Sequence, residues 1–143
     1  MQTNKEVSSH PFAEDKVAIM PCAGMDKALG SVARACAFRV VEKLRPDKAI
    51  LICIPPLAVG VKPYFEIVKK YPCIPVDGCA ERCATKIAVK NGARIKARIL
   101  IPESVQKYNL KPKSASDLGP DGEKLAERLA EEIATEIDKL LGK

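Results

Sequence analysis

The fold is decided by residues 17–56, which read VAIMPCAGMDKALGSVARACAFRVVEKLRPDKAILICIPP. The apolar run at 17–20 predicts a short buried strand. Residues 27–44 place apolar side chains at helical spacing, with Asp26 as the expected N-cap and Pro46 beyond the end. Residues 49–54 are wholly apolar, which is typical of a strand covered on both faces, and two prolines follow. A strand, a helix and a second buried strand in this order favour a parallel sheet.

The rest of the chain continues the alternation. We expect a helix at 61–70 with Tyr64, Phe65 and Val68 inward, a strand at 73–76, a helix at 79–91 and an edge strand at 95–101. The sequence therefore predicts the α/β class: one three-layer, doubly wound domain with a mostly parallel four-stranded sheet and an extra C-terminal helix.

Four parts of the chain follow from this pattern. Residues 1–15, which contain the lone His10, are expected to be a flexible tail in which this histidine is a bystander; residues 16–108 are the α/β domain, and 109–122 are a linker. Residues 123–143 form an amphipathic helix whose apolar stripe is Leu125, Leu129, Ile133, Ile137 and Leu140. We expect this helix to pack on its own domain, and a homodimer through the same stripe is the alternative.

Composition narrows the function classes. The chain has 143 residues, 47 % hydrophobic and 29 % charged, with a formal net charge of +6 but no long basic run and no tryptophan. Scattered Lys and Arg are more typical of a solvated surface than of nucleic-acid binding. The first residues lack the apolar core of a signal peptide, and no segment is long enough to span a bilayer, so we expect a cytoplasmic protein without membrane contact. In a reducing compartment, six cysteines favour metal binding or catalysis over disulfides.

Four of the six cysteines follow predicted strands. Cys22 comes directly after the first strand, Cys53 lies near the end of the second, and Cys79 and Cys83 follow the third. Ligands of open α/β sheets bind outside the carboxyl ends of the strands, so these four thiols are expected at one edge. Cys36 lies on a helix's apolar stripe and Cys73 opens a strand; both are expected in the core.

The chemistry of four converging thiolates suits a metal. On the expected helix, Cys79 and Cys83 are i and i+4, about 5–6 Å apart at Cβ, and near a helix N-terminus that favours thiolate. Tetrahedral zinc binds four cysteines with Zn–S of about 2.3 Å. An iron–sulfur cluster is compatible with the same four residues. The same i, i+4 geometry also permits a redox dithiol or a persulfide carrier at Cys79 and Cys83.

Asp77 precedes Cys79 in the turn Asp77-Gly78. It is interpreted either as an acceptor behind the metal ligands, or as an extra ligand, or as ordinary turn and helix-capping chemistry. These readings stay open from the sequence.

The strings VDGCAERC (residues 76–83) and PCAG (21–24), with Cys53 after an apolar strand, resemble the DGC-domain family, which is described as zinc-binding with four shared cysteines. The resemblance covers about residues 16–102. It implies Cys22, Cys53, Cys79 and Cys83 as the metal ligands, with Asp77 and Gly78 completing the motif. The turn after Cys22, AGMDKALG (23–30), lacks the small hydroxyl residues of many relatives.

The expected function is zinc binding, with a thiol-redox or sulfur-carrying enzyme as the alternative. No histidine and only Asp77 as a carboxylate lie near the four cysteines in the predicted fold, so a general base is hard to assign. Four thiolates also leave zinc no open position for Lewis-acid chemistry. No substrate or reaction follows from the sequence.

Overall fold

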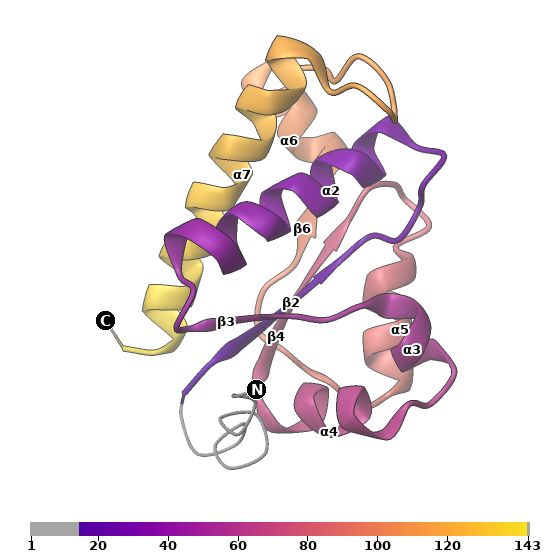
Figure 1. The fold of residues 1–143 in the computed structure, drawn as a ribbon, viewed down its shortest axis with the longest axis vertical. Helices are drawn as coiled ribbons and strands as arrows, with labels where there is room; N and C mark the ends of the chain where they lie inside the picture. The colour runs from indigo at the N-terminus through magenta and orange to yellow at the C-terminus, as the bar shows by residue number, and fades with distance from the viewer. Residues whose placement is uncertain (1–14, 143) are drawn as a thin grey trace.

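The computed structural model describes residues 15–142, which form an α/β domain around a parallel sheet (Figure 1). The strand order is β3 (Ala49–Leu51), β2 (Val17–Pro21) and β4 (Pro72–Asp77), and β4 then pairs with both β5 (Arg94–Ile95) and β6 (Ile99–Leu100). Every pairing is parallel. Because β5 and β6 share one side of β4, the sheet has four strand positions, which confirms the predicted class. The predicted tail, with His10, lies outside the described residues except for Asp15.

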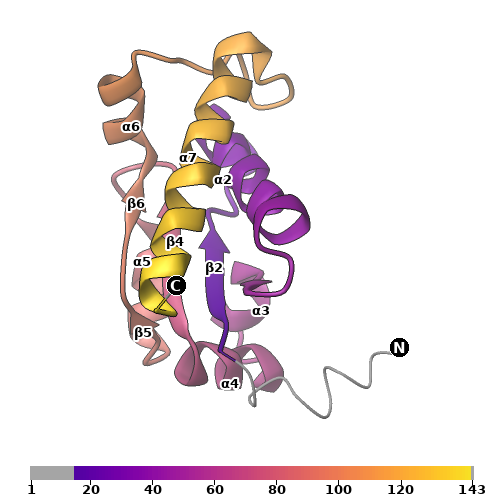
Figure 2. The ribbon, with the colours of Figure 1, turned by 90° about the vertical axis from the view of Figure 1, so that its left-hand side faces the viewer.

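The sheet has helices on both faces. Side chains alternate along β2, so Val17 and Ile19 enter one apolar cluster while Ala18 and Met20 enter the other. The first cluster is covered by α2 (Ala28–Arg39), η1 (Val40–Leu44) and α7 (Gly119–Leu140), and the second by α3 (Ile54–Ala58), α4 (Lys62–Lys70) and α5 (Cys83–Lys90). Three layers result, as predicted, and Figure 2 shows α7 lying beside α2.

The first helix matches its prediction in extent but not in its cap. α2 continues into the π-helical η1 up to Leu44, so the two together span the expected 27–44 region. Asp26 is not the N-cap: Lys27 holds that position, no side chain accepts a hydrogen bond there, and the Lys27 carbonyl accepts from Ser31 N at 3.1 Å.

The second strand is shorter than predicted. β3 ends at Leu51, although the sequence predicts a strand that continues to residue 54 and is ended by the two prolines. Residues 54–58 form the helix α3 instead. Pro55 and Pro56 fit the first helical turn, where backbone N–H groups have no partner within the helix. Cys53 therefore lies at the N-cap position of α3.

The predicted edge strand at 95–101 is interrupted. Only residues 94–95 and 99–100 pair with β4, and Ile101 already belongs to α6 (Ile101–Tyr108), a helix that the sequence did not predict. Pro102 lies in the first turn of α6, as the prolines do in α3.

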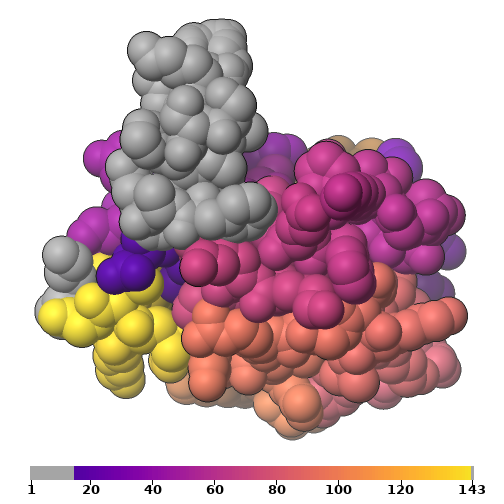
Figure 3. All heavy atoms as spheres, turned by 90° about the horizontal axis from the view of Figure 1, so that it is seen from below, coloured from indigo at the N-terminus to yellow at the C-terminus, as the bar shows by residue number. Residues whose placement is uncertain are grey.

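On α4, the inward face is narrower than predicted. Val68 is fully buried, but Phe65 is exposed, with the Lys69 Nζ 4.9 Å from its ring centre. Figure 3 shows α4 (magenta) at the surface beside the segment that contains β5 (salmon).

The C-terminal helix packs on its own domain, as predicted. Its stripe residues Leu125, Leu129, Ile133 and Ile137 are fully buried in the cluster shared with α2 and η1. Arg45 adds a two-pronged ion pair to Asp138, at 2.9 and 2.7 Å. α7 begins at Gly119, four residues before the predicted start. Within residues 15–142, no helix combines the length and the apolar character that a bilayer crossing requires.

Candidate metal centre

Three of the four predicted ligand cysteines follow the carboxyl ends of three adjacent strands. Cys22 comes directly after β2, Cys53 lies two residues after β3, and Cys79 lies two residues after β4. In the sheet these strands stand side by side in the order β3-β2-β4. The structure therefore places the three thiols at the same edge of the sheet, and Cys83 follows at the start of α5.

Cys22 is the central and most buried of the four. Its backbone N–H donates to the Val76 carbonyl at 2.8 Å, which extends the contact between β2 and β4 by one residue. Its Sγ accepts a hydrogen bond from Gly24 N at 3.3 Å, and its exposed fraction is 9 %. The Cys22 thiol is thus held in place by the turn that leads into α2.

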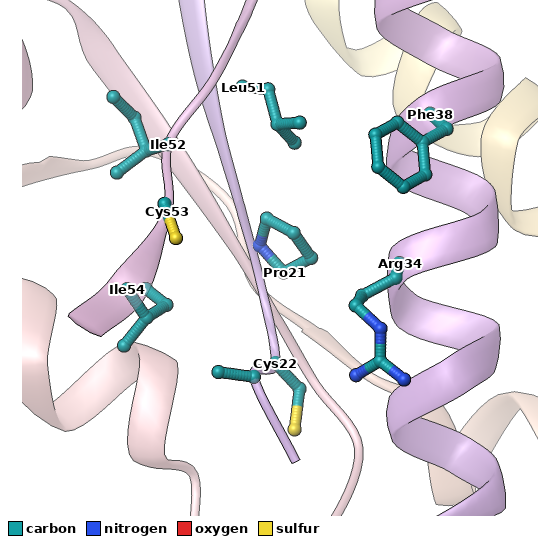
Figure 4. A pocket seen from close by; sticks show the side chains of 9 residues that line it. Pro21, Cys22, Arg34, Phe38, Leu51, Ile52, Cys53 and Ile54 are labelled. Carbon is teal, nitrogen blue, oxygen red and sulfur yellow. The ribbon is translucent and has the colours of Figure 1, made fainter. Parts of the chain in front are cut away.

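Cys22 and Cys53 line one cavity of about 150 Å³ between the ends of β2 and β3 and the helix α2. Figure 4 shows the two thiols on the strand side and Arg34 and Phe38 on the α2 side. Cys53 itself is exposed, so an ion or reagent can reach this pair from solvent.

Cys79 and Cys83 are not on one helix. α5 begins at Cys83, and Cys79 lies in the preceding turn, which the Arg82 N–H closes by donating to the Cys79 carbonyl at 3.0 Å. Arg82 adopts a left-handed conformation with φ of 54°. The predicted i, i+4 helical pair is therefore wrong, and Cys83 is exposed while Cys79 is half-buried.

Asp77 explains where α5 begins. Its Oδ1 accepts from Ala84 N at 2.8 Å, and its Oδ2 accepts from Thr85 N at 3.3 Å and from the Thr85 hydroxyl. The carboxylate is only 2 % exposed and caps the first turn of α5 across the intervening loop. Capping is thus the observed role of Asp77, and by fixing the first turn it also positions Cys83.

Close backbone packing joins the two loops that carry Cys22 and Cys79. A Cβ on Gly30 of α2 would lie 2.2 Å from the Gly24 carbonyl oxygen, so only glycine allows the Cys22 turn to approach the helix this closely. A Cβ on Gly78 would lie 3.0 Å from the backbone nitrogen of Gly30. The glycine of the Asp77-Gly78 turn therefore lets the Cys79 loop lie against the start of α2.

The two remaining cysteines are core residues, as predicted. Cys36 and Cys73 are fully buried, and burial raises the pKa of each thiol to about 12. The Cys36 Sγ donates to the Ala33 carbonyl, and the Cys73 Sγ lies within hydrogen-bonding distance of the Val68 and Tyr71 carbonyls. Because a metal ligand must lose its proton, the raised pKa makes these two thiols poorer ligands than a solvent-accessible cysteine.

The four edge cysteines do not form a completed ligand cluster. In the part of the chain that the structure describes, no three His, Cys, Asp or Glu side chains are grouped so that they could hold a metal ion. Cys22, Cys53, Cys79 and Cys83 thus share an edge, and the metal ligand set remains a prediction.

Arg34 is the residue of this edge that sequence reasoning missed. It lies on α2, and its guanidinium reaches the Cys22 turn by donating to the Gly24 carbonyl at 3.1 Å. The sequence gives only a weak indication that Arg34 belongs to a site. Arg34 and Phe38 are four residues apart and so lie on one helix face, beside the apolar stripe formed by Val32, Cys36 and Val40. The same spacing is equally typical of a solvated helix face.

The comparisons with known proteins give a family. The sequence model of the DGC domain matches residues 18–133, which include most of α7 and so extend beyond the region of about 16–102 on which the resemblance rested. No curated protein and no solved structure matches the chain. Since the match covers most of the chain, and the Asp-Gly-Cys turn at 77–79 lies at the edge just described, this protein belongs to the DGC domain family.

Proposed function

We propose that this protein binds one zinc ion through Cys22, Cys53, Cys79 and Cys83. The observation that carries the proposal is the placement of cysteines after three adjacent strands, β3, β2 and β4. Cysteines that serve only to fill the core would not be expected to follow neighbouring strands. The two fully buried cysteines do not: Cys36 lies within α2 and Cys73 lies near the start of β4.

The donor chemistry fits zinc. Thiolates are the soft ligands that zinc prefers in structural sites, and four of them complete a tetrahedral shell. Zinc bound there would add a cross-link between loops that now meet through backbone packing at Gly30 and Gly78 and through the hydrogen bond from Cys22 N to the Val76 carbonyl. The ion would supply folding free energy to this edge rather than an open coordination position.

Assembly of such a site needs a local change of conformation. The segment 78–82, between β4 and α5, contains no helix or strand and carries Cys79. The Asp77 cap fixes the first turn of α5 and with it Cys83. Cys22 is held by the hydrogen bond that its Sγ accepts from Gly24 N. We therefore expect the turn that carries Cys79 to change its conformation when the metal binds.

A binding or structural role is favoured over zinc catalysis. Asp77, the carboxylate in the turn before Cys79, already accepts three hydrogen bonds from α5 and is buried. Because its oxygens already accept these hydrogen bonds as a helix cap, the carboxylate is poorly placed to take a proton as a general base. The six free thiols also favour a reducing compartment, and we place the protein in the cytoplasm.

The proposal is tested by metal analysis of protein purified without added metal and without oxygen. We expect about one zinc per chain and four thiols protected from a mild thiol reagent. Serine at any of the four edge positions should lower zinc retention, whereas the control variants Cys36→Ser and Cys73→Ser should keep it. Loss of zinc from the two controls, or metal-free wild-type protein, would overturn the assignment.

A second candidate is thiol chemistry at Cys79 and Cys83. The specific observation is that Cys83 is exposed at the first position of α5, and that Cys79 lies in the turn just before it. Exchange with a second disulfide would oxidise these two thiols to one disulfide, and the second disulfide would take up the two electrons and two protons and be reduced to two thiols. This candidate predicts metal-free protein in which Cys83 reacts readily with iodoacetamide, the opposite of the zinc result.

A further inference from the structure

The cavity that Cys22 and Cys53 line has the shape and the lining of a binding site for a small molecule. Its walls are apolar side chains of β2, β3, α3 and α2, including Leu51, Ile54 and Phe38. Among the described residues that line it, Arg34 is the one charged side chain (Figure 4). We propose that this cavity binds a small monocarboxylate with an apolar body, whose carboxylate pairs with Arg34.

Hydrogen bonds fix the orientation of the Arg34 guanidinium, but no carboxylate of residues 15–142 balances its positive charge. It donates to the Gly24 carbonyl at 3.1 Å and to the Ser31 hydroxyl at 3.2 Å. Those bonds use two of the five N–H donors of an arginine, and the other three have no hydrogen-bond partner within residues 15–142. Arg34 forms no salt bridge with a carboxylate of residues 15–142, unlike Arg39 at the end of α2 and Arg45 just after η1.

The segment before α7 fixes this orientation. The Ser31 hydroxyl, which accepts from Arg34, itself donates to the Ala115 carbonyl. The chain at 109–118 thus holds Ser31, and Ser31 holds one side of the guanidinium. A pre-oriented guanidinium loses little entropy when it pairs with a planar carboxylate.

The size of the cavity sets the ligand class. The cavity has a volume of about 150 Å³ and opens to solvent beside the exposed Cys53 and Phe38. An enclosed apolar cavity of about this volume holds a benzene molecule. An aromatic ring or a branched chain of five or six carbons fits that space. A planar carboxylate matches the fork of Arg34 better than a spherical anion does.

The site does not rest on zinc binding. Cys22 and Cys53 line the cavity, but Cys79 and Cys83 do not. The double variant Cys79→Ser, Cys83→Ser therefore removes two of the proposed zinc ligands and leaves the cavity wall complete. Carboxylate binding that persists in this variant, alongside loss of zinc, separates the two proposals.

The test uses benzoate as the probe, with benzyl alcohol as its uncharged counterpart, on the full chain labelled at isoleucine methyl groups. We expect benzoate to bind and to shift the methyl resonance of Ile54, which lines the cavity, but not that of Ile137, which is buried in the apolar cluster under α7 and does not line the cavity. Benzyl alcohol should bind about 10- to 100-fold more weakly, because it cannot form the charge-assisted pair.

Arg34→Met should weaken benzoate binding by a similar factor. Arg39→Met is the matched control, since Arg39 lies on the same helix but pairs with Glu123 and Glu127 of α7, outside the cavity. Equal affinity for benzoate and benzyl alcohol, wild-type affinity in Arg34→Met, or no shift at Ile54 would each overturn the proposal.

Discussion

Replacing Asp77 by alanine is expected to destabilise the fold more than any other change to a carboxylate in the described chain. The side chain is 2 % exposed and accepts hydrogen bonds from Ala84 N, Thr85 N and the Thr85 hydroxyl. Ala84 is fully buried and Thr85 nearly so, so water cannot replace the carboxylate. The variant therefore leaves buried donors without partners.

The magnitude follows from these three bonds. Loss of a helix cap costs about 0.5–2 kcal/mol, and hydrogen bonds to a charged group contribute about 1.5–3 kcal/mol each, without simple additivity. We expect Asp77→Ala to lower the free energy of unfolding by about 2–4 kcal/mol. Asp77→Asn should lose less, because its amide oxygen can still accept one bond.

The assay is urea denaturation, with midpoints compared at a common slope. Asp26→Ala is the matched control: Asp26 is exposed and caps nothing, so its change should stay within about 0.5 kcal/mol of wild type. Stability of Asp77→Ala within that same margin would refute the capping role and, with it, the reason that α5 begins at Cys83.

Two further changes test the packing of this edge and the core thiols. Gly30→Ala should cost about 1–3 kcal/mol in urea denaturation, because its Cβ meets the Gly24 carbonyl oxygen. Gly24→Ala is its control, since the nearest atom there is the Cys22 Sγ at 3.4 Å, and equal stabilities would contradict the close approach. Burial raises the pKa of Cys36 and Cys73 from 9.0 to about 12, so the folded state retains these protons longer than the unfolded state. The contribution of the two protonated thiols to the free energy of unfolding is complete below about pH 9 and falls as the pH rises toward 12, by at most about 1.4 kcal/mol per pH unit for each thiol. The slope of stability between about pH 9 and pH 11 should be shallower in Cys36→Ala, Cys73→Ala than in wild type; identical slopes would show that the thiols titrate normally.

The sheet and its largest helices were predictable because their patterns are unambiguous. The stripe from Leu125 to Ile137 fits only the helical period. The apolar run at 17–20 is short and is followed by Pro21, which favours a buried strand over a helix, and both elements lie where expected. The parallel sheet and the placement of cysteines after three strands followed from the same alternation, whereas the order of the strands in the sheet comes from the structure alone.

The errors have two causes, and the first is residues that suit two structures. Pro55 and Pro102 end a strand, but they also fit the first turn of a helix, and the structure uses them in the second way. Asp26 looks like a cap because of its type and position, whereas the effective cap, Asp77, lies seven residues before the amide that it holds. A cap across a loop leaves no local signal, so the start of α5 and the separation of Cys79 from the helix could not be predicted.

The most direct test of the central claim is zinc X-ray absorption spectroscopy on the purified protein. The proposal predicts a first shell of four sulfur atoms at about 2.3 Å, reduced to three in Cys53→Ser and unchanged in Cys73→Ser. A shell of nitrogen and oxygen ligands, or protein that retains no zinc, would contradict it.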